Sequence, residues 1–533
     1  MIDHTTRVTR RRLLLGGVGV AGAALLAACG GGTATVAPTA RPATGASTAP
    51  STAPAAAPSS AASSVPAAPA ASAAPSAAAA ASATPAASSA AAIPSSAPLP
   101  AATVRIALFG SQEAADAAKK LFAIAKQQQP NISVDVTPYQ APDWSGFFEK
   151  LLTQVAAGQT PDMASVATEG AHLFAGRKLA ISLDEYIKRD KEQLREYFKD
   201  VSPALVEAMM YEGKLYSLPD NFNAANLYYS KTAFDKKGVK YPIDWTKDQF
   251  AEAAPKLATI SGGRTTEYAY FWTNRMWGGA LPWMFINGGN ILTEEKAPGG
   301  EQIWGEFYKD VAQAQGRGGG YRWNKATANA PANVEALQFL SDLTNKQKVA
   351  PSPAEAESSN ATINTTFANG QLAMFASGGF LVRGLTVAGV KPESYSATFM
   401  PKWKGQRHQF GTAGFWIFEA SKNKDAAWEL AKFRISKEAM TAQFPNGSSV
   451  PARRSLAQPL YEGTYGFKDY AVFYDTLDKY PDTAPIPQPP SANQVTAIFT
   501  KYIGLAMTED LTPQAALDQM QKELTDVLAK PIQ

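Results

Sequence analysis

The chain of 533 residues contains one cysteine, Cys29, and three histidines. A single cysteine excludes a disulfide within the chain, even in an oxidising compartment. Only His172 and His408 lie beyond the N-terminal region. This scarcity disfavours a metal held by histidines and a Ser-His catalytic triad. We therefore expect no cofactor, no metal and no catalytic residue.

An excess of charge of one sign is also missing from most of the chain. The sequence holds 50 basic and 46 acidic residues, and residues 1–102 account for five arginines and one aspartate. The remaining 431 residues therefore contain 45 of each sign, and the net charge of +4 belongs to the N-terminal region. Without a large basic patch, we expect no nucleic-acid partner.

The N-terminal apolar run is too short for a membrane span. Residues 13–28 carry no charge, follow Arg10–Arg12, and end in small residues and the cysteine at Leu26–Cys29. About 20 apolar residues are needed to cross a bilayer. A positive segment, a short apolar run and a small-residue end are instead typical of an export signal. We assign residues 1–28 to such a signal.

Two parts of this signal resemble known motifs. The arginines resemble those of a twin-arginine export signal, which carries proteins that have already folded. Leu26–Cys29 resembles a lipobox, whose cysteine is acylated after cleavage. This resemblance implies an exported lipoprotein, attached through Cys29 to the outer face of the cytoplasmic membrane, on the periplasmic or extracellular side. The alternative, a buried N-terminal helix, leaves Arg10–Arg12 unexplained.

The next segment, residues 29–102, is built almost entirely of Ala, Pro, Ser, Thr and Gly. Arg41 is its one charged residue. Such a composition buries too little apolar surface to offset the entropy lost on ordering. The repeated prolines also interrupt any Ala-rich helix. We predict a disordered tether.

Residues 103–533 are too long for one core and suit two large lobes. Strands are predicted at 104–109, 132–136 and 163–167, with Ser111 and Asp143 as N-caps of the helices between them. This alternation predicts an α/β fold with parallel strands. Further strands are predicted at 226–230, 371–376 and 411–419, a hairpin at 209–216, a helix at 424–435, and two final helices after a proline-rich segment at 481–490.

Open parallel sheets bind ligands beyond the carboxyl ends of their strands. Phe109 ends the first predicted strand, Ser111 follows it, and Glu169 follows the third. These three residues are therefore candidates for ligand binding.

Aromatic residues gather between positions 268 and 285, where Trp272, Trp277 and Trp283 occur. Tryptophan stacking against flat C–H faces, together with hydrogen bonds from amides, is the chemistry expected for sugar recognition. Large aromatic side chains also dominate protein cores. Each tryptophan therefore has a core alternative, and we expect at least one of them to line a ligand cleft.

Other polar residues carry weaker signals. Glu113 and Glu169 could pair as the acid and base of a glycoside hydrolase, but no flanking motif supports the required opposed carboxylates. We expect Glu113 to be solvated and Glu169 to accept a hydrogen bond from a ligand hydroxyl. Gly316–Gly320 lacks the preceding strand of a phosphate-binding loop. His408, among basic residues, is typical of a solvated turn.

Five segments follow the order found in one known family. They resemble the carbohydrate group, family 1, of extracellular solute-binding proteins of ABC importers, to which maltose-binding protein belongs, and the resemblance extends over essentially all of residues 103–533. The segments are 152–162 (LTQVAAGQTPD), 212–231 (EGKLYSLPDNFNAANLYYSK), 367–380 (FANGQLAMFASGGF), 411–433 and 448–454 (SSVPARR).

The resemblance implies a two-lobed periplasmic-binding-protein type II fold, hinged by crossing strands. Each lobe is then assembled from separated segments. Lobe 1 is expected at 103–222 and 413–480, and lobe 2 at 223–412 and 481–533.

The resemblance also implies further binding residues. Asn223 stands where the family often has a carboxylate facing the sugar, and Phe380 where it has a stacking aromatic, commonly tryptophan. Trp277 falls in a stretch that supplies another stacking ring, and Asn493 lies near the place of a further aromatic. The departures at Asn223, Phe380 and Asn493 leave open which sugar binds, and also leave open a non-sugar ligand.

We expect from this resemblance a monomer that captures a sugar or oligosaccharide by lobe closure. It would deliver this ligand unchanged to the permease subunits of an ABC transporter. Two alternatives remain: a surface-tethered glycoside hydrolase, and a binding protein for a polyamine or other small polar ligand, because aromatic cages also attract cations. The asparagines between 221 and 226 favour a neutral polyol over a cation.

Overall fold

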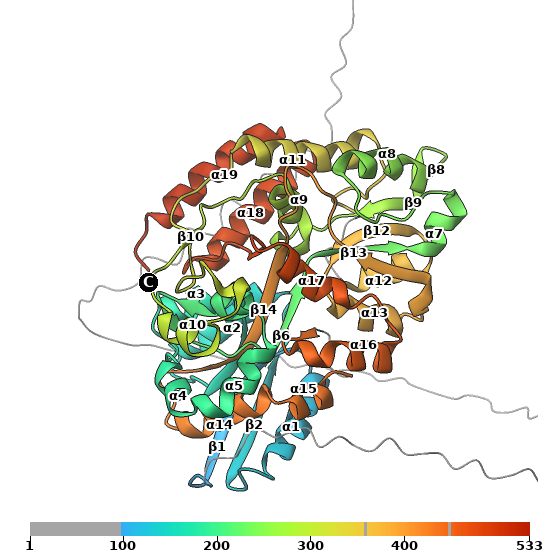
Figure 1. The fold of residues 1–533 in the computed structure, drawn as a ribbon. Coiled ribbons are helices and arrows are strands. Elements are labelled where there is room, and N and C mark those ends of the chain that lie inside the picture. Colours follow the sequence, from blue (N-terminus) through green and yellow to red (C-terminus); the bar gives the residue numbers. More distant parts are fainter. Residues whose placement is uncertain (1–97, 356–359, 446–448, 533) are drawn as a thin grey trace, which may run out of the picture. The chain divides into compact units, whose positions relative to one another are not determined.

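The computed structural model describes residues 98–355, 360–445 and 449–532. They belong to one unit of the chain, residues 86–533, which Figure 1 draws in colour from residue 98 onward. The predicted export signal, Cys29 and nearly all of the predicted tether fall outside the described residues. None of the described helices combines the length and the apolar character that a membrane crossing requires.

The first lobe is built on a mixed sheet of seven strands. β1 pairs in parallel with β2 and with β3, as the strand–helix alternation predicts, and β14 runs antiparallel between β3 and β6. The strands are β1 Ala102–Phe109, β2 Ile132–Tyr139, β3 Met163–Ala167, β6 Asn221–Ala224, β14 Gln409–Ile417, β15 Val450–Pro451 and β16 Ala484–Pro485.

Helices and a small hairpin surround this sheet, and two predicted N-caps are confirmed. Ser111 Oγ accepts a hydrogen bond from Ala114 N, and Asp143 Oδ1 accepts one from Gly146 N. The elements are α1 Gln112–Ala125, α2 Trp144–Ala156, α3 Thr168–Gly176, α4 Asp184–Arg189, α5 Lys191–Asp200, α6 Pro203–Ala208, β4 Met210–Tyr211, β5 Lys214–Leu215, α14 Lys424–Arg434, α15 Lys437–Gln443, α16 Ala457–Tyr465 and α17 Ala471–Lys479.

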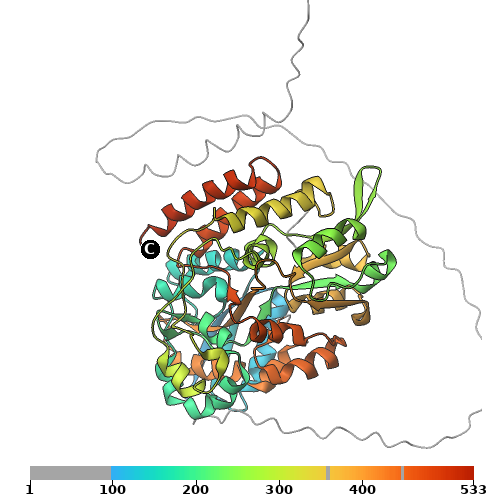
Figure 2. The same ribbon diagram turned by 45° about the horizontal axis from the view of Figure 1, so that its top comes forward.

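The second lobe is built on a sheet of five strands, in the order β13-β7-β12-β9-β8. Both views show α11, α18 and α19 side by side over this lobe (Figures 1 and 2). The elements are β7 Asn226–Ser230, α7 Lys231–Lys237, α8 Lys247–Leu257, β8 Thr259–Ser261, β9 Arg264–Phe271, α9 Leu281–Ile286, α11 Pro331–Ser341, α12 Asn360–Ala368, β12 Leu372–Ser377, α13 Phe380–Val387, β13 Tyr395–Thr398, α18 Ala492–Met507 and α19 Pro513–Leu528.

The chain crosses between the lobes on adjacent strands, as a hinged fold requires. Ala225 alone separates β6 of the first sheet from β7 of the second. The chain returns to the first lobe between β13 and β14. The two crossing segments are hydrogen-bonded to each other, because Ala225 N donates to Gln409 O at 2.8 Å. The two-lobed α/β fold expected from the sequence is therefore confirmed.

A segment of the second lobe reaches across to the first. We call residues 294–323 the strap; it contains β10 Glu295–Lys296, α10 Glu301–Phe307 and β11 Tyr321–Arg322. Glu207 of α6 is fully buried beneath it and accepts hydrogen bonds from Lys296 Nζ (2.8 Å), Arg317 Nη1 (2.7 Å) and Gly318 N (2.8 Å). Figure 1 shows α10 beside α5 of the first lobe.

The glycine-rich sequence Gly316–Gly320 is explained by this strap. Gly213 N, in the β4–β5 hairpin, donates to Gly319 O at 2.9 Å. A Cβ at Gly319 would lie 2.3 Å from the Cα of Gly213, so a side chain there would clash with the hairpin backbone. The glycines serve close packing.

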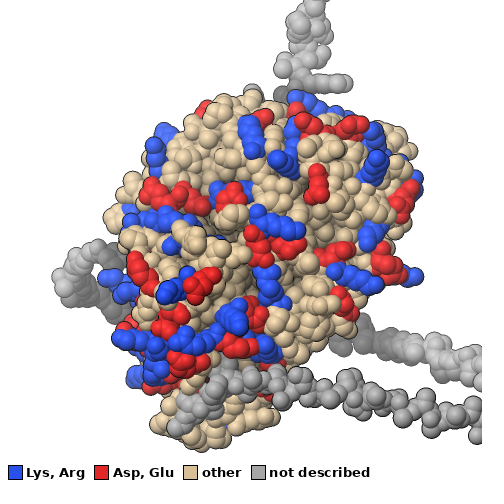
Figure 3. Space-filling model, in the orientation of Figure 1, with Lys and Arg blue, Asp and Glu red and all other residues tan. Residues whose placement is uncertain are grey.

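The expectation that His408 lies in a solvated turn is wrong. The His408 side chain is buried and packs against Phe399 and Tyr480, with ring centroids 5.7 and 5.0 Å away. Its basic neighbours in sequence misled the prediction: Lys402 and Lys404 are exposed, whereas His408 itself leads into β14. Charged side chains of both signs lie side by side across the face shown in Figure 3.

Candidate functional site

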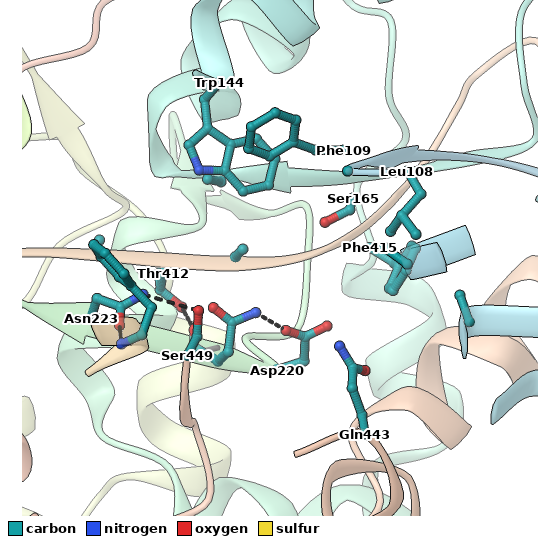
Figure 4. Close-up of a pocket in the computed structure, with 18 of the residues that line it drawn as sticks. Leu108, Phe109, Trp144, Ser165, Asp220, Asn223, Thr412, Phe415, Gln443 and Ser449 are labelled. Carbon is teal, nitrogen blue, oxygen red and sulfur yellow. Dashed lines mark hydrogen bonds between the residues drawn. The ribbon is translucent and has the colours of Figure 1, made fainter. Parts of the chain in front are cut away.

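A cavity of about 1090 Å³ lies between the two lobes. The first lobe contributes the ends of β1 and β3 with parts of α1, α2 and α15, and the second contributes residues 275–277 and Phe380. Figure 4 shows Phe109 and Trp144 on one side, with Asn223, Ser449 and Asp220 across from them. The cavity thus lies where the strand-end rule directs attention.

Two aromatic pairs line the cavity, one from each lobe. In the first lobe, Phe109 ends β1 and its ring lies 4.6 Å from the Trp144 ring, centroid to centroid. In the second lobe, the centroids of Trp277 and Phe380 are 5.7 Å apart. All four rings are partly exposed. The cavity therefore offers flat apolar faces from both walls.

Trp277 is held by the strand that crosses between the lobes. Trp277 lies in the irregular turn η2, Met276–Ala280. Gly278, which follows Trp277 in this turn, has a φ of +70°. Gln409 Oε1 in β14 accepts a hydrogen bond from Gly278 N at 2.8 Å. A Cβ at Gly411 would lie 3.2 Å from Trp277 Nε1, so glycine lets β14 approach the indole closely.

Asn223 lines the cavity, but its amide is engaged by the protein. Asn223 Oδ1 accepts a hydrogen bond from Phe380 N at 3.2 Å, and Asn223 Nδ2 donates to Ser449 Oγ at 3.1 Å. In this geometry the amide orients Phe380. It has fewer hydrogen bonds left for a ligand than a free amide would have.

Glu169 and Arg275 carry opposite charges in the cavity wall, one on each lobe. Thr168 Oγ1 donates to Glu169 Oε2 at 3.1 Å, and Arg275 Nη1 donates to Asn360 Oδ1 at 3.3 Å. Within the described residues neither side chain forms an ion pair, and Arg275 Nε and Nη2 have no hydrogen-bond partner. Both groups retain capacity to bind a ligand.

Burial opposes both of these charges. It raises the pKa of the Glu169 carboxyl above its ordinary value, an effect that the Thr168 hydroxyl and the Arg275 charge partly offset. It lowers the pKa of Arg275 to about 10, against the attraction of Asp143 and Glu169. Hydrogen bonds from a ligand would compensate the lost hydration of both groups.

Two predicted residues lie beside the cavity rather than in its lining. Ser111 is exposed and caps α1. Asn493 Oδ1 accepts a hydrogen bond at 3.0 Å from Ser145 Oγ, and Ser145 does line the cavity. Glu113 is exposed, as expected, although it also lines the cavity.

The structure places Trp272 and Trp283 in the core of the second lobe, away from the cavity lining. Both side chains are fully buried. Trp272 Nε1 donates to Pro351 O, and Trp283 Nε1 donates to Tyr270 Oη, each at 2.9 Å. Of the three tryptophans, Trp277 alone lines the cavity.

Sequence analysis missed several lining residues. Trp144 follows the helix cap Asp143 after the second parallel strand, so the strand-end rule could have indicated it. Arg434 reads as a basic residue in the last turn of a helix, where it complements the helix dipole. The residues missed include Trp144, Ser165, Asp220, Arg275, Arg434, Gln443, Ser449 and Gln488.

The described residues contain no group of three or more His, Cys, Asp or Glu side chains placed to hold a metal ion. The arrangement can instead stack rings against apolar faces, accept hydrogen bonds at Glu169 and donate them at Arg275. This is the chemistry of non-covalent recognition of a polar ligand.

Known proteins share this fold at low sequence identity. An ABC substrate-binding protein of Listeria monocytogenes, solved with cycloalternan, superposes with a TM-score of 0.66 at 24% identity, covering 80% of this chain and 99% of that one. A maltose-bound protein of T. maritima gives a TM-score of 0.62 at 20% identity, over 80% of this chain and 99% of that one.

Sequence comparison agrees with the structural likeness. The galactooligosaccharide-binding protein of Bacillus subtilis is 21% identical over 400 residues, which cover 74% of this chain and 83% of that one. The family model of bacterial extracellular solute-binding proteins matches residues 120–470. That span includes the whole second sheet, most strands of the first sheet, and Trp144, Trp277 and Phe380. The chain belongs to the bacterial extracellular solute-binding proteins.

Proposed function

We propose that this protein is a lipid-anchored solute-binding protein that captures a sugar or small oligosaccharide. The ligand is then delivered unchanged to the permease of an ABC transporter. The observation that carries the proposal is the pair of aromatic walls, Phe109 with Trp144 and Trp277 with Phe380, with Glu169 and Arg275 between the lobes. Relatives that bind cycloalternan, maltose and galactooligosaccharides support the same ligand class.

The lining suits a sugar for a physical reason. A pyranose ring has flat C–H faces that stack on aromatic rings and an edge of hydroxyls that both donate and accept hydrogen bonds. Glu169 supplies an acceptor and Arg275 supplies donors, so a neutral polyhydroxylated ligand satisfies both. A polyamine would face the unpaired guanidinium of Arg275. The volume of about 1090 Å³ is at the upper end of ligand pockets, which favours an oligosaccharide.

Capture follows from where these groups lie. Because the two aromatic pairs belong to different lobes, a ligand contacts both only when the lobes are closed. A ligand that binds one state more tightly shifts the population toward that state. The closed form is then the form that the permease recognises.

Attachment to the membrane is the part of the proposal that rests on sequence. Cys29 follows the small residues of the export signal. An acyl chain on Cys29 would hold the binding unit at the outer face of the cytoplasmic membrane, while the Ala/Pro/Ser segment gives it reach. Metabolic labelling with a radioactive fatty acid tests this, because Cys29→Ser is expected to abolish labelling and release the protein.

A thermal-shift screen against sugars tests the ligand class. A ligand at about 100 times its dissociation constant stabilises the folded state by about 2.7 kcal/mol. We expect neutral oligosaccharides to raise the melting temperature and spermidine to leave it unchanged. Stabilisation by spermidine alone would contradict the proposal.

Each stabilising sugar is then incubated with the purified protein and analysed by chromatography. Intact sugar is expected after long incubation. Cleavage that Glu169→Gln abolishes would identify a glycoside hydrolase instead, because Glu169 is a carboxylate in the cavity wall whose pKa burial raises.

A further inference from the structure

A second group of polar side chains lines the same cavity, entirely on the first lobe. Ser165 lies in β3, Asp220 precedes β6, Arg434 ends α14 and Gln443 ends α15. We call these four residues the deep polar end. Figure 4 shows Asp220 and Gln443 across the cavity from Phe109 and Trp144, and Ser165 nearer to Phe109 and Leu108.

Asp220 and Arg434 form an ion pair within the deep polar end. Arg434 Nε lies 3.3 Å from Asp220 Oδ2, and the two side chains are 7% and 4% exposed, respectively. Asn221 Nδ2 donates to Asp220 Oδ1. Burial raises the pKa of Asp220 and lowers that of Arg434, and each charge partly offsets the shift of the other.

The pair leaves much of its hydrogen-bonding capacity unused. Among the described residues, Arg434 contacts Asp220 through Nε, and no hydrogen bond engages its two terminal nitrogens or the side chains of Ser165 and Gln443. Buried polar groups are nearly always paired in folded proteins. Groups that line a cavity without a protein partner are therefore positioned to pair with a ligand.

We propose that the deep polar end binds two adjacent hydroxyls of one sugar ring of the ligand. The inference rests on the proposed function and specifies which chemical feature of the sugar is read. The Asp220 carboxylate accepts a hydrogen bond from one hydroxyl and the Arg434 guanidinium donates one to the neighbouring hydroxyl. Ser165 and Gln443 each add one further hydrogen bond. The ring that binds here is neutral, because an anion would face Asp220 and a cation would face Arg434.

The apolar surroundings fit the same ring. Leu108 and Phe415 line the cavity next to these polar groups. They offer apolar contact to the C–H face of a ring whose hydroxyls point to the ion pair. Since all of these residues belong to the first lobe, this ring binds before the second lobe closes with Trp277 and Phe380.

The experiment compares ligands and variants by calorimetry on the full chain. The probes are maltotriose, galactotriose and raffinose, their singly deoxygenated derivatives, and digalacturonate and chitobiose as anionic and amino-sugar-derived comparisons. We expect one neutral oligosaccharide to bind, and removal of either hydroxyl of one vicinal pair to weaken binding about 10-fold or more, because those hydroxyls meet charged partners.

Variants test the residues without breaking the buried ion pair. Gln443→Leu and Ser165→Ala should each weaken binding of the neutral oligosaccharide about 3- to 10-fold. They should also reduce the penalty for deoxygenation. Gln159→Leu is the matched control, because Gln159 is exposed and outside the cavity lining, and its affinity should equal that of the wild type.

The possible outcomes distinguish failure of this inference from failure of the proposed sugar-binding function. If a neutral sugar binds but no single deoxygenation and neither variant changes its affinity, the deep polar end has no role and the inference fails alone. Preference for digalacturonate also overturns it. If no probe binds to the wild type, the proposed function itself is contradicted.

Discussion

At the scale of single residues, burial separates the three tryptophans that look alike in sequence. Trp272 and Trp283 are fully buried and their indole N–H groups are paired, whereas Trp277 faces the cavity beside Phe380. A ring in the core stabilises the folded chain. A ring in a cavity wall contributes mainly when a ligand covers it.

The first prediction contrasts these two roles. Trp277→Ala and Phe380→Ala should each weaken sugar binding by about 1–3 kcal/mol, the size of other stacking losses, with little change in stability of the ligand-free protein. Trp283→Ala should instead lower the free energy of unfolding by about 3–5 kcal/mol, because it opens a cavity in the core. Calorimetry and denaturant unfolding measure the two effects. Equal loss of stability in Trp277→Ala would place that ring in the core.

The second prediction concerns His408. Burial lowers its pKa to about 4, against an ordinary value of 6.5. Between pH 6.5 and about 4, His408 is protonated in the unfolded chain but stays neutral in the folded chain. Stability therefore falls as the pH drops from 6.5 to about 4, by about 1.4 kcal/mol per pH unit for this group.

His408→Phe should remove that contribution, because phenylalanine fills the same aromatic pocket beside Phe399 and Tyr480 without titrating. Urea unfolding at several pH values between 4 and 6.5 measures the slope. His172, whose pKa burial lowers to about 3, keeps its own contribution in this variant. An unchanged slope would mean that His408 is solvated in the folded protein.

At the scale of elements, the strap is the feature that most distinguishes this fold from two lobes joined only by crossing strands. Besides the Glu207 contacts, the rings of Phe307 and Phe198 stack with centroids 4.1 Å apart, and Tyr308 Oη donates to Val201 O at 3.0 Å. A segment of the second lobe is thereby fastened to α5 and α6 of the first.

The third prediction tests this attachment. Glu207→Ala should lower the free energy of unfolding by about 3–5 kcal/mol, because Arg317 is then left buried without its carboxylate. Glu192→Ala is the control: it removes an exposed partner of Arg195 and should change stability little. Chemical denaturation measures both. If Glu192→Ala lowered the free energy of unfolding as much as Glu207→Ala, the effect would come from removing a charge and not from the burial of Glu207.

At the scale of the whole molecule, the lobes should approach each other when a ligand binds. The fourth prediction uses Lys119 on α1 and Ile243 in the second lobe, both exposed. Fluorophores on cysteines at these positions, in a Cys29→Ser background, should show higher energy transfer when sugar is added. Transfer that is identical with and without a bound sugar would contradict lobe closure.

Much of the first lobe could be predicted because its signals are local. Strand alternation, the caps Ser111 and Asp143, and the end of β1 at Phe109 all depend on neighbours within a few residues. These strand assignments also predicted the edge of the sheet where a ligand binds, because parallel strands end at one side of a sheet. Glu169 was predicted at the cavity by the same strand-end rule, and Phe380 through the family resemblance.

The deep polar end could not be predicted in this way. Asp220 and Arg434 are separated by more than 200 residues and meet only because β6, β14 and α14 pack together. His408 was misassigned for the same reason, since its burial depends on Phe399 and Tyr480, which lie elsewhere in the chain.

The sequence by itself determined the class of fold and the order of its elements, and it carries the prediction of an export signal, because local periodicity, capping and composition act over short distances. The tertiary structure alone decided which tryptophan faces the cavity, which charges pair inside it and where the strap attaches. Those outcomes depend on burial, and burial of a side chain is set by segments that are distant in sequence.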